Sequence, residues 1–403
     1  MRGIPSELKP EFQVAGLVAF AHLLSHFYML VLPPLFPLLR SEFHVGYAEL
    51  GFAITAYAVT TGVLQTPMGF LVNRIGGRKV LIGGLVVNAG TIALMGFVTS
   101  MWQFTGLMFI AGIGSSVFHP ADYSILNARV GAARLGRALS IHTLGGNLGF
   151  VLAPPVMLTL VAISNWRVGL MVVSGVGLLL ALVMLALSGV IGEGGMGKRR
   201  AADSWGKLVT SPNVMMLFGF YVLSSVANCG VVYFSVVAFQ GIYNLPATVT
   251  AAALTAYQVM SMAAVLPGGW LADKVEDHEM LLAGSFLTSG AVLVLCALGL
   301  LPFAIVVALV GVSGFLRGMV SASRDVSVRH AAKDVSVGTL FGFVTTGYSG
   351  GQIIGPTLYG WLMDLGHPGA VLWASAGFST LAIVTMMTGR LWRRQRALVA
   401  AGE

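Results

Sequence analysis

Four histidines and one aspartate in the first half of the chain lie within stretches that are otherwise almost free of charge. They are His22, His26, His119, Asp122 and His142. Ionisable groups at membrane depth are energetically costly, so those that are present usually have a function. A histidine beside a carboxylate exchanges protons near physiological pH, and such exchange can drive antiport. The alternative is a network of satisfied hydrogen bonds that only holds helices together, and the sequence alone favours neither interpretation.

Depth along the helices predicts which of these residues meet. If the fourth apolar crossing begins near Gln103, a rise of 1.5 Å per residue places His119 at ~24 Å and Asp122 at ~28 Å. In a core of ~30 Å, both then lie in the cytoplasmic third. His142 begins the next crossing from the same side, at ~7 Å. We therefore expect His119, Asp122 and His142 to be neighbours and to carry the proton.

His22 and His26 are one turn apart on the same helix face, near mid-depth, where we expect them to face a substrate cavity. An i, i+4 histidine pair also suits a transition metal. The other histidines are expected at different depths, however, and the first apolar stretch has no carboxylate. The sequence therefore predicts no metal site. A transporter of a transition metal or of its chelate stays a distant alternative.

Arg317 is the candidate for holding the substrate. It lies ~21 Å along its helix, and no acid in the neighbouring crossings is an obvious partner. An arginine at that depth suits an anion, which it can bind through two hydrogen bonds. The alternative partner is a backbone carbonyl or Tyr348. Further polar side chains near mid-depth would line a mildly polar cavity, although a single such side chain more often forms a hydrogen bond between two helices. These residues are Tyr57, Asn147, Asn228, Tyr257, Gln258, Tyr348 and Gln352.

Composition explains why these groups should lie in lipid. The chain has 403 residues, of which 56% are hydrophobic and 9% are charged, and its mean hydropathy is +0.86. Soluble domains carry about 25% charged residues. The net charge of +8 does not indicate nucleic acid, because basic residues collect in the cytoplasmic loops of membrane proteins. Cys229 and Cys296 form neither a disulfide framework nor a metal knuckle.

Nine stretches lack Asp, Glu, Lys and Arg, and three of them are long enough to cross a membrane twice. We therefore predict an all-α membrane protein with twelve transmembrane helices. The nine stretches are 12–39, 50–73, 80–121, 138–166, 168–192, 208–272, 280–316, 335–363 and 365–389. Residues 1–190 are expected to form one six-helix bundle and 213–403 the other, joined by a linker at 191–212. Because nineteen of the 23 Lys and Arg residues fall on the side of the termini, both ends should be cytoplasmic.

The two halves repeat one another. Residues 55–74 and 255–274 are identical at seven of twenty positions without a gap. Two six-helix halves related in this way, together with the segment 69–79, resemble the major facilitator superfamily. That segment is similar to the family's signature loop between helices 2 and 3, and 269–274 is its partial second copy. The resemblance implies a gating role for Gly69, Asn73, Arg74, Gly77, Arg78, Gly269 and Asp273, with Asn73 where the family usually has Asp.

A narrower resemblance lies in two short stretches. Residues 114–120 (GSSVFHP) and 145–149 (GGNLG) are similar to the fosmidomycin-resistance branch of the superfamily. That resemblance implies export of small drugs, a phosphonate antibiotic among them, driven by the proton gradient. The chain departs from the branch at Ala121, where an acid usually follows the His-Pro pair directly, and at Ala153, where a glycine usually precedes the proline.

The chain has no phosphate-binding loop, nucleophile elbow or zinc motif, so we predict neither an enzyme nor a cofactor. The function that we expect is secondary active transport across a bacterial inner membrane, most of all proton-coupled export of small anionic or amphipathic compounds. The alternatives are uptake or exchange of an organic or phosphorylated anion and, more remotely, a transport-dead receptor. The expected partners are a small-molecule substrate, protons and the bilayer, with the protein a monomer.

Overall fold

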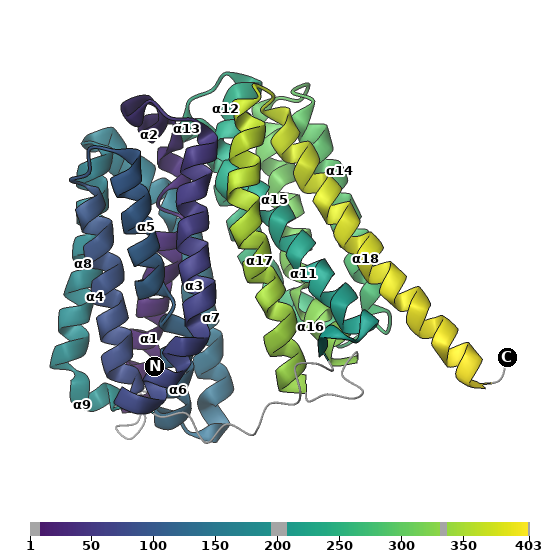
Figure 1. Ribbon diagram of the computed structural model, residues 1–403, viewed down its shortest axis with the longest axis horizontal. Coiled ribbons are helices and arrows are strands. Elements are labelled where there is room, and N and C mark those ends of the chain that lie inside the picture. The colour runs from purple at the N-terminus through teal and green to yellow at the C-terminus, as the bar shows by residue number, and fades with distance from the viewer. Residues whose placement is uncertain (1–8, 195–207, 331–336, 402–403) are drawn as a thin grey trace, which may run out of the picture. The chain divides into compact units, whose positions relative to one another are not determined.

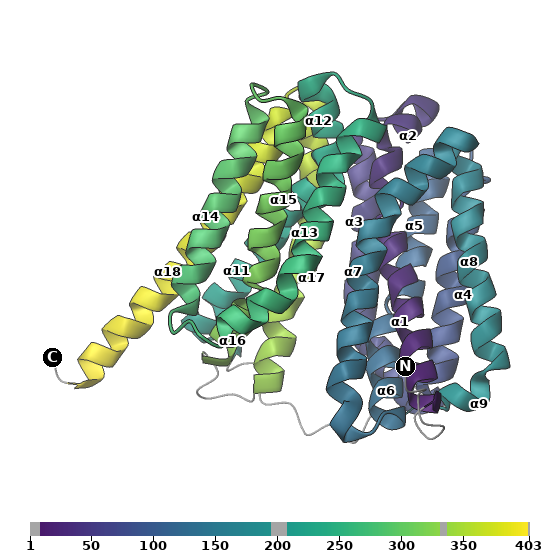
Figure 2. The ribbon, with the colours of Figure 1, turned by 180° about the vertical axis from the view of Figure 1, so that it is seen from behind.

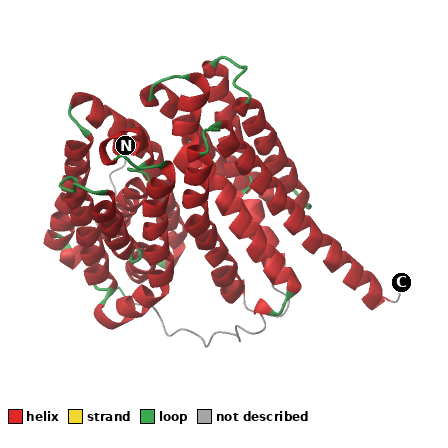
Figure 3. Cartoon of the chain, turned by 45° about the horizontal axis from the view of Figure 1, so that its top comes forward, coloured by secondary structure: helices red, strands yellow, loops and turns green. Residues whose placement is uncertain are grey.

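Helices connected by short turns and loops make up the residues described by the computed structural model, which are 9–194, 208–330 and 337–401. No strand occurs in these ranges (Figure 3). Backbone polar groups find no water in a lipid interior, so each segment has to satisfy its own hydrogen bonds, as a helix does. Most of the predicted linker 191–212 lies outside the described residues.

Within the described residues, ten helical segments are long and apolar enough to cross a membrane. Two more helices, α3 (Tyr47–Ile75) and α17 (Val337–Asp364), are 29 and 28 residues long. Both exceed the ~20 residues that a crossing needs, but they are less apolar than the other ten. The twelve helices predicted from the sequence are therefore accounted for.

The chain divides into two compact units, one made of residues 1–45 and 52–199 and the other of residues 46–51 and 200–403. The first unit is drawn from purple to blue-teal in Figures 1 and 2. Besides most of α3, it contains α1 (Lys9–Met29), η2 (Pro33–Leu35), α2 (Phe36–Phe43), α4 (Gly77–Met95), α5 (Met101–Ser115), α6 (Phe118–Arg129), α7 (Ala132–Ile163), α8 (Trp166–Ala186) and α9 (Ser188–Ile191).

The second unit runs from teal to yellow in the same views. It contains α11 (Pro212–Cys229), a π-helical turn η3 (Gly230–Phe234), α12 (Ser235–Tyr243), α13 (Ala247–Ala272), α14 (His278–Ala297), α15 (Phe303–Met319), α16 (Ser321–His330), α17 and α18 (Gly369–Ala401). π-Helical turns are rare and frequently mark functional positions.

The fourth crossing is broken in the middle, and this break positions the site described below. Helix α5 ends at Ser115 and α6 begins at Phe118. Pro120 has no N–H to donate, and its ring crowds the carbonyl of Ser116, so one continuous helix is disfavoured here. The corresponding crossing of the second unit is also broken, between α15 and α16 at Val320.

Glycines let α7 approach α1 until their backbones touch. A Cβ atom added at Gly145 would lie 2.5 Å from the carbonyl oxygen of Ala19, and one at Gly149 would lie 2.2 Å from that of Leu23. Small residues at a spacing of four are the usual means by which transmembrane helices pack closely. Side chains carried by α1 are therefore brought directly against α7.

Candidate functional site

Five ionisable side chains of the first unit meet in one place, which we call the histidine–aspartate cluster: His22 and His26 from α1, His119 and Asp122 from α6, and His142 from α7. At the centre of the cluster, Oδ2 of Asp122 lies 3.1 Å from Nδ1 of His22 and 3.0 Å from Nε2 of His142. The aspartate is fully buried. Over the part of the chain that the structure describes, no lysine or arginine pairs with it. Its charge is therefore balanced by imidazoles or not at all.

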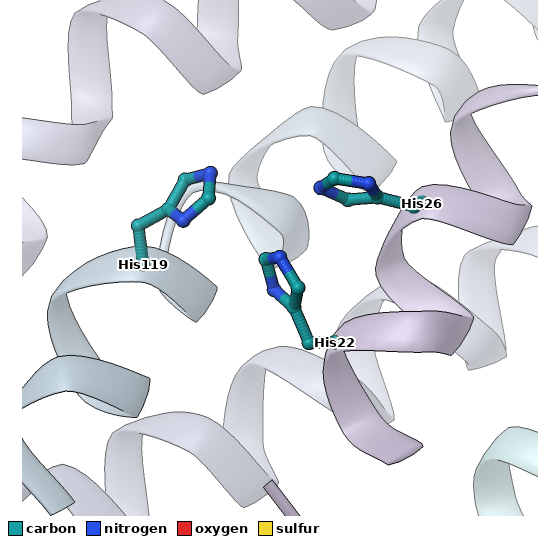
Figure 4. A group of neighbouring side chains, drawn as sticks. All are labelled: His22, His26 and His119. Carbon is teal, nitrogen blue, oxygen red and sulfur yellow. The ribbon is translucent and has the colours of Figure 1, made fainter. Parts of the chain in front are cut away.

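The imidazole rings gather around His22. Its ring centroid lies 3.7 Å from that of His142, in a stacked arrangement, 4.4 Å from that of His26 and 5.0 Å from that of His119. Figure 4 shows the rings of His22 and His26 extending from one helix toward His119 on another. His22, Asp122 and His142 are buried, whereas His26 and His119 are partly exposed. The cluster is thus open on the side of His26 and His119.

Several polar atoms of the cluster have no hydrogen-bond partner among the described residues, although they are buried. They are the Nδ1 atoms of all four histidines and Oδ1 of Asp122. Nδ1 of His22 is close to the aspartate but is not aligned for a hydrogen bond. Buried polar atoms are nearly always satisfied. Two sets within the cluster have the composition and proximity to hold a metal ion, His22–His26–His119 and His22–Asp122–His142, each with ligand atoms within 4.8 Å of one another.

Local sequence explains why the rings fit. His22 and His26 share one face of α1 because they are four residues apart. Opposite them α7 carries Gly146, where an added Cβ would lie 2.8 Å from atoms of both rings. The break before α6 places His119 in the first turn of that helix and Asp122 one turn later. The GGNLG stretch of α7 thus forms the surface against which the α1 histidines pack.

The structure brings His119, Asp122 and His142 together, as their depths predict. The separation of His22 and His26 from these residues, and the argument against a metal set that rested on it, are wrong. That argument treated each helix as a straight rod and ignored side-chain length. In fact the fourth crossing is broken, and an imidazole reaches several ångströms from its backbone.

Arg317 lies in the second unit. Its Nη2 donates to the carbonyl of Ser224 at 3.4 Å, and its guanidinium carbon lies 3.9 Å from the centre of the Phe286 ring. The backbone-carbonyl alternative is therefore the one observed. Nη1, however, is buried and has no partner among the described residues. One face of the guanidinium packs on an aromatic ring, and one nitrogen remains able to donate.

Three of the other predicted substrate residues bond one another. Asn228 of α11 accepts a hydrogen bond from Tyr257 of α13 at 3.1 Å and donates to Tyr348 of α17 at 3.3 Å. Gln352 accepts from Tyr233 of η3 at 2.8 Å, a residue that the sequence analysis missed because it lies in an unbroken apolar run. In the first unit Tyr57 donates to Ser115 at 2.6 Å, while Asn147 and, in the second unit, Gln258 are half-buried.

The predicted gating loop turns at Gly76, whose φ of +93° favours glycine. Arg78 follows it, donates to the carbonyl of Ser188 at 2.8 Å and forms an ion pair with Glu193. A Cβ atom at Gly77 would lie 3.1 Å from Ile125, so α4 packs closely on α6. The remaining polar residues of the two loop copies, Asn73, Arg74 and Asp273, are exposed.

Comparison with known proteins identifies the family. The family model of the Major Facilitator Superfamily matches residues 18–253 and 223–401. The chain belongs to this superfamily. Its fold agrees with a crystal structure of the nucleoside transporter NupG, with a TM-score of 0.76 and 15% identity, covering 94% of this chain and 99% of that one. This major facilitator protein is thus a multi-pass membrane protein, as the sequence predicts.

Two curated relatives match part of the chain. The fosmidomycin resistance protein of Escherichia coli is 27% identical over 181 residues, 45% of this chain and 44% of the relative. A probable sulfoacetate transporter of Cupriavidus necator is 26% identical over 171 residues, 42% of this chain and 40% of the relative. The matched stretches span less than half the length of either relative. The predicted resemblance to the fosmidomycin-resistance branch is confirmed.

Proposed function

We propose that this chain is a secondary transporter that exports small organic anions across the bacterial inner membrane in exchange for protons, with both of its termini in the cytoplasm. Membership of the superfamily supports alternating access as the means of transport. The observation that carries the coupling is the burial of Asp122 against two imidazoles, with no basic side chain among the described residues to balance it.

An uncompensated carboxylate in a membrane interior is strongly disfavoured. A proton shared between Asp122 and His142 removes that charge, and the 3.0 Å contact provides a direct route for transfer between the two side chains. His119 is on the same helix as Asp122 and partly exposed, so it is placed to pass the proton between the aspartate and water. Delivery of the proton to opposite sides in the two access states would couple its movement to that of the substrate.

Arg317 supports an anion as the substrate. Its free Nη1 retains the ability to donate a charge-assisted hydrogen bond, the interaction by which arginine recognises carboxylates, sulfonates and phosphonates. The Tyr257–Asn228–Tyr348 chain of the same unit adds neutral hydroxyl and amide groups. A site with one cation and several neutral hydrogen-bonding groups fits a small organic anion.

Uptake of an anion is the second candidate, because one relative is named as a probable sulfoacetate transporter and not as a resistance protein. Both candidates use the same coupling site and differ only in the direction of substrate movement. The two candidates are therefore distinguished by whether substrate moves against the direction of proton flow or along with it when the imposed proton gradient is reversed.

The test uses the full chain in liposomes that enclose a pH-sensitive dye under an imposed pH gradient, with sulfoacetate and a small phosphonate added one at a time. We expect one of them to trigger proton movement, and Asp122→Asn to abolish it. The matched control is Asp325→Asn on α16, an acid that is paired with Arg324 at 3.1 Å. Substrate flux in the wild type without any proton signal, or full coupling in Asp122→Asn, would refute the proposal.

A further inference from the structure

The histidine–aspartate cluster has more lone pairs than proton transfer needs. A carboxylate and one imidazole suffice to carry a proton, and Asp122 with His142 provides them. Beyond this pair, His22, His26 and His119 place three more imidazoles around one point, with ligand nitrogens within 4.8 Å of one another (Figure 4). Nδ1 is buried and without a hydrogen-bond partner in each of the three.

We propose that His22, His26 and His119 form a binding site for a divalent transition-metal ion, and that the bound ion stops proton coupling by occupying the cluster. Three protonated imidazoles at this separation would repel one another strongly in a low-dielectric interior. A single divalent ion satisfies three neutral imidazoles at once, because each contributes a lone pair. The arrangement therefore fits a metal ion better than it fits three protons.

The distances are compatible with coordination. Zinc binds imidazole nitrogen at ~2.0–2.1 Å in tetrahedral geometry, so two ligand nitrogens lie ~3.3 Å apart. The three nitrogens here are at most 4.8 Å apart, and closing that gap of up to ~1.5 Å needs only ring rotations about the side-chain bonds. His22 and His26 extend from one face of α1, and His119 extends from α6. The ligands therefore approach the proposed ion from two different helices.

The donor set selects the class of ion. Imidazole nitrogen suits Zn²⁺, Ni²⁺ and Cu²⁺, whereas Mg²⁺ and Ca²⁺ prefer oxygen. The two candidate ligand sets consist of histidines and one aspartate, so imidazole nitrogen dominates the donors. Asp122 and His142, which touch His22, are available as a fourth ligand or as the outer shell that orients it. Entry is from the side of His26 and His119, the two partly exposed members.

Metal binding is measured independently of transport, so the two proposals can fail separately. The full chain is purified without a polyhistidine tag and placed in lipid nanodiscs. Co²⁺ is titrated in and followed by its visible spectrum, and Zn²⁺ is then used to displace it. We expect one ion per chain with an intense four-coordinate spectrum. His26→Gln and His119→Gln should each weaken binding by at least about tenfold, while His367→Gln, an exposed histidine of the other unit, should leave it unchanged.

A second measurement uses only the wild type, in case a variant does not fold. Bound Zn²⁺ should protect His26 and His119, the two partly exposed ligands, from carbethoxylation, detected by mass spectrometry, while the exposed His367 stays reactive. Absence of stoichiometric binding, or binding that persists unweakened in a folded triple Gln variant, would overturn the proposal. If coupled transport is found, Zn²⁺ should inhibit it in the wild type, and transport that continues unchanged with the site filled would refute the blocking role.

Discussion

The close approach of α7 to α1 yields the sharpest prediction, because the contact consists of backbone atoms that cannot rotate away. In Gly149→Ala the new methyl group would lie 2.2 Å from the carbonyl oxygen of Leu23 and 2.9 Å from the amide nitrogen of Phe27. Ordinary contacts of a Cβ atom begin near 3.4 Å. The two helices must therefore separate by about 1 Å, and overpacking of this kind destabilises a protein by ~1–3 kcal/mol.

Gly175→Ala provides the matched control. Gly175 lies within α8 of the same unit, and nothing lies within 4 Å of an added Cβ. Both substitutions gain the same helix propensity, so it cancels when the two variants are compared. The remaining difference of ~1–3 kcal/mol corresponds to ~2–12 °C in unfolding midpoint for a unit of about 200 residues. The midpoints are measured by scanning fluorimetry in one detergent. Equal midpoints would show that α1 and α7 are not in backbone contact.

Three further predictions concern charged residues outside the cluster. Arg317→Lys keeps the charge but lacks the planar fork in which Nη2 donates to Ser224 while Nη1 stays available to an anion. We therefore expect anion affinity measured by calorimetry to fall by about tenfold, as the loss of ~1.5 kcal/mol for one charge-assisted hydrogen bond implies. Unchanged affinity would remove this residue from the substrate site. Two hydrogen bonds from Arg390 lower the pKa of Asp277 below its ordinary value of 3.8. The stabilisation by this pair is therefore present at neutral pH and lost as pH falls below about 4. The difference in unfolding midpoint between wild type and Asp277→Asn should shrink on acidification, and a constant difference would contradict the assignment. Arg78→Glu and Glu193→Arg should each destabilise the protein, and the double variant, which restores an ion pair, should regain part of the lost stability. We expect a coupling energy of ~0.5–1 kcal/mol in the double-mutant cycle. A cycle without coupling would show that the ion pair contributes nothing.

The number of helices was predictable because lipid leaves the chain few alternatives. A segment free of charge and about 20 residues long is stable in a bilayer only as a helix, so the charge-free stretches show the crossings directly. The repeat between 55–74 and 255–274 adds the division into two similar halves, which is typical of the superfamily. Proline also gives local information, because α1 ends at Met29 and Pro33 and Pro34 form a short 3-10 turn before α2 begins.

The histidine–aspartate cluster was only partly predictable, because the depth of a residue along its helix does not show which helices pack against one another. Counting residues placed Asp122 near His142 correctly, since both lie close to the turn between Arg129 and Ala132 that joins the two crossings. It separated His22 from them because it assumed unbroken helices. A usable signal was present in Gly145 and Gly149, whose spacing of four indicates a closely packed partner helix. Nothing in the sequence, however, says that the partner is α1, which is more than a hundred residues away.

The two units also show what the internal repeat preserves. In the first unit, Arg78 at the start of α4 pairs with Glu193, which follows α9. About 200 residues later, Glu279 at the start of α14 pairs with Arg393 on α18. The contact joins equivalent ends of the third and sixth crossings in both halves, but acid and base have exchanged places. The ion pair is present in both halves although its acid and base have exchanged positions. We infer that it joins two helix ends, because recognition of an external charge would require the same sign of charge at the same position. The recognition of protons and anions is therefore better sought where the halves differ, in the histidine–aspartate cluster of the first unit and at Arg317 in the second.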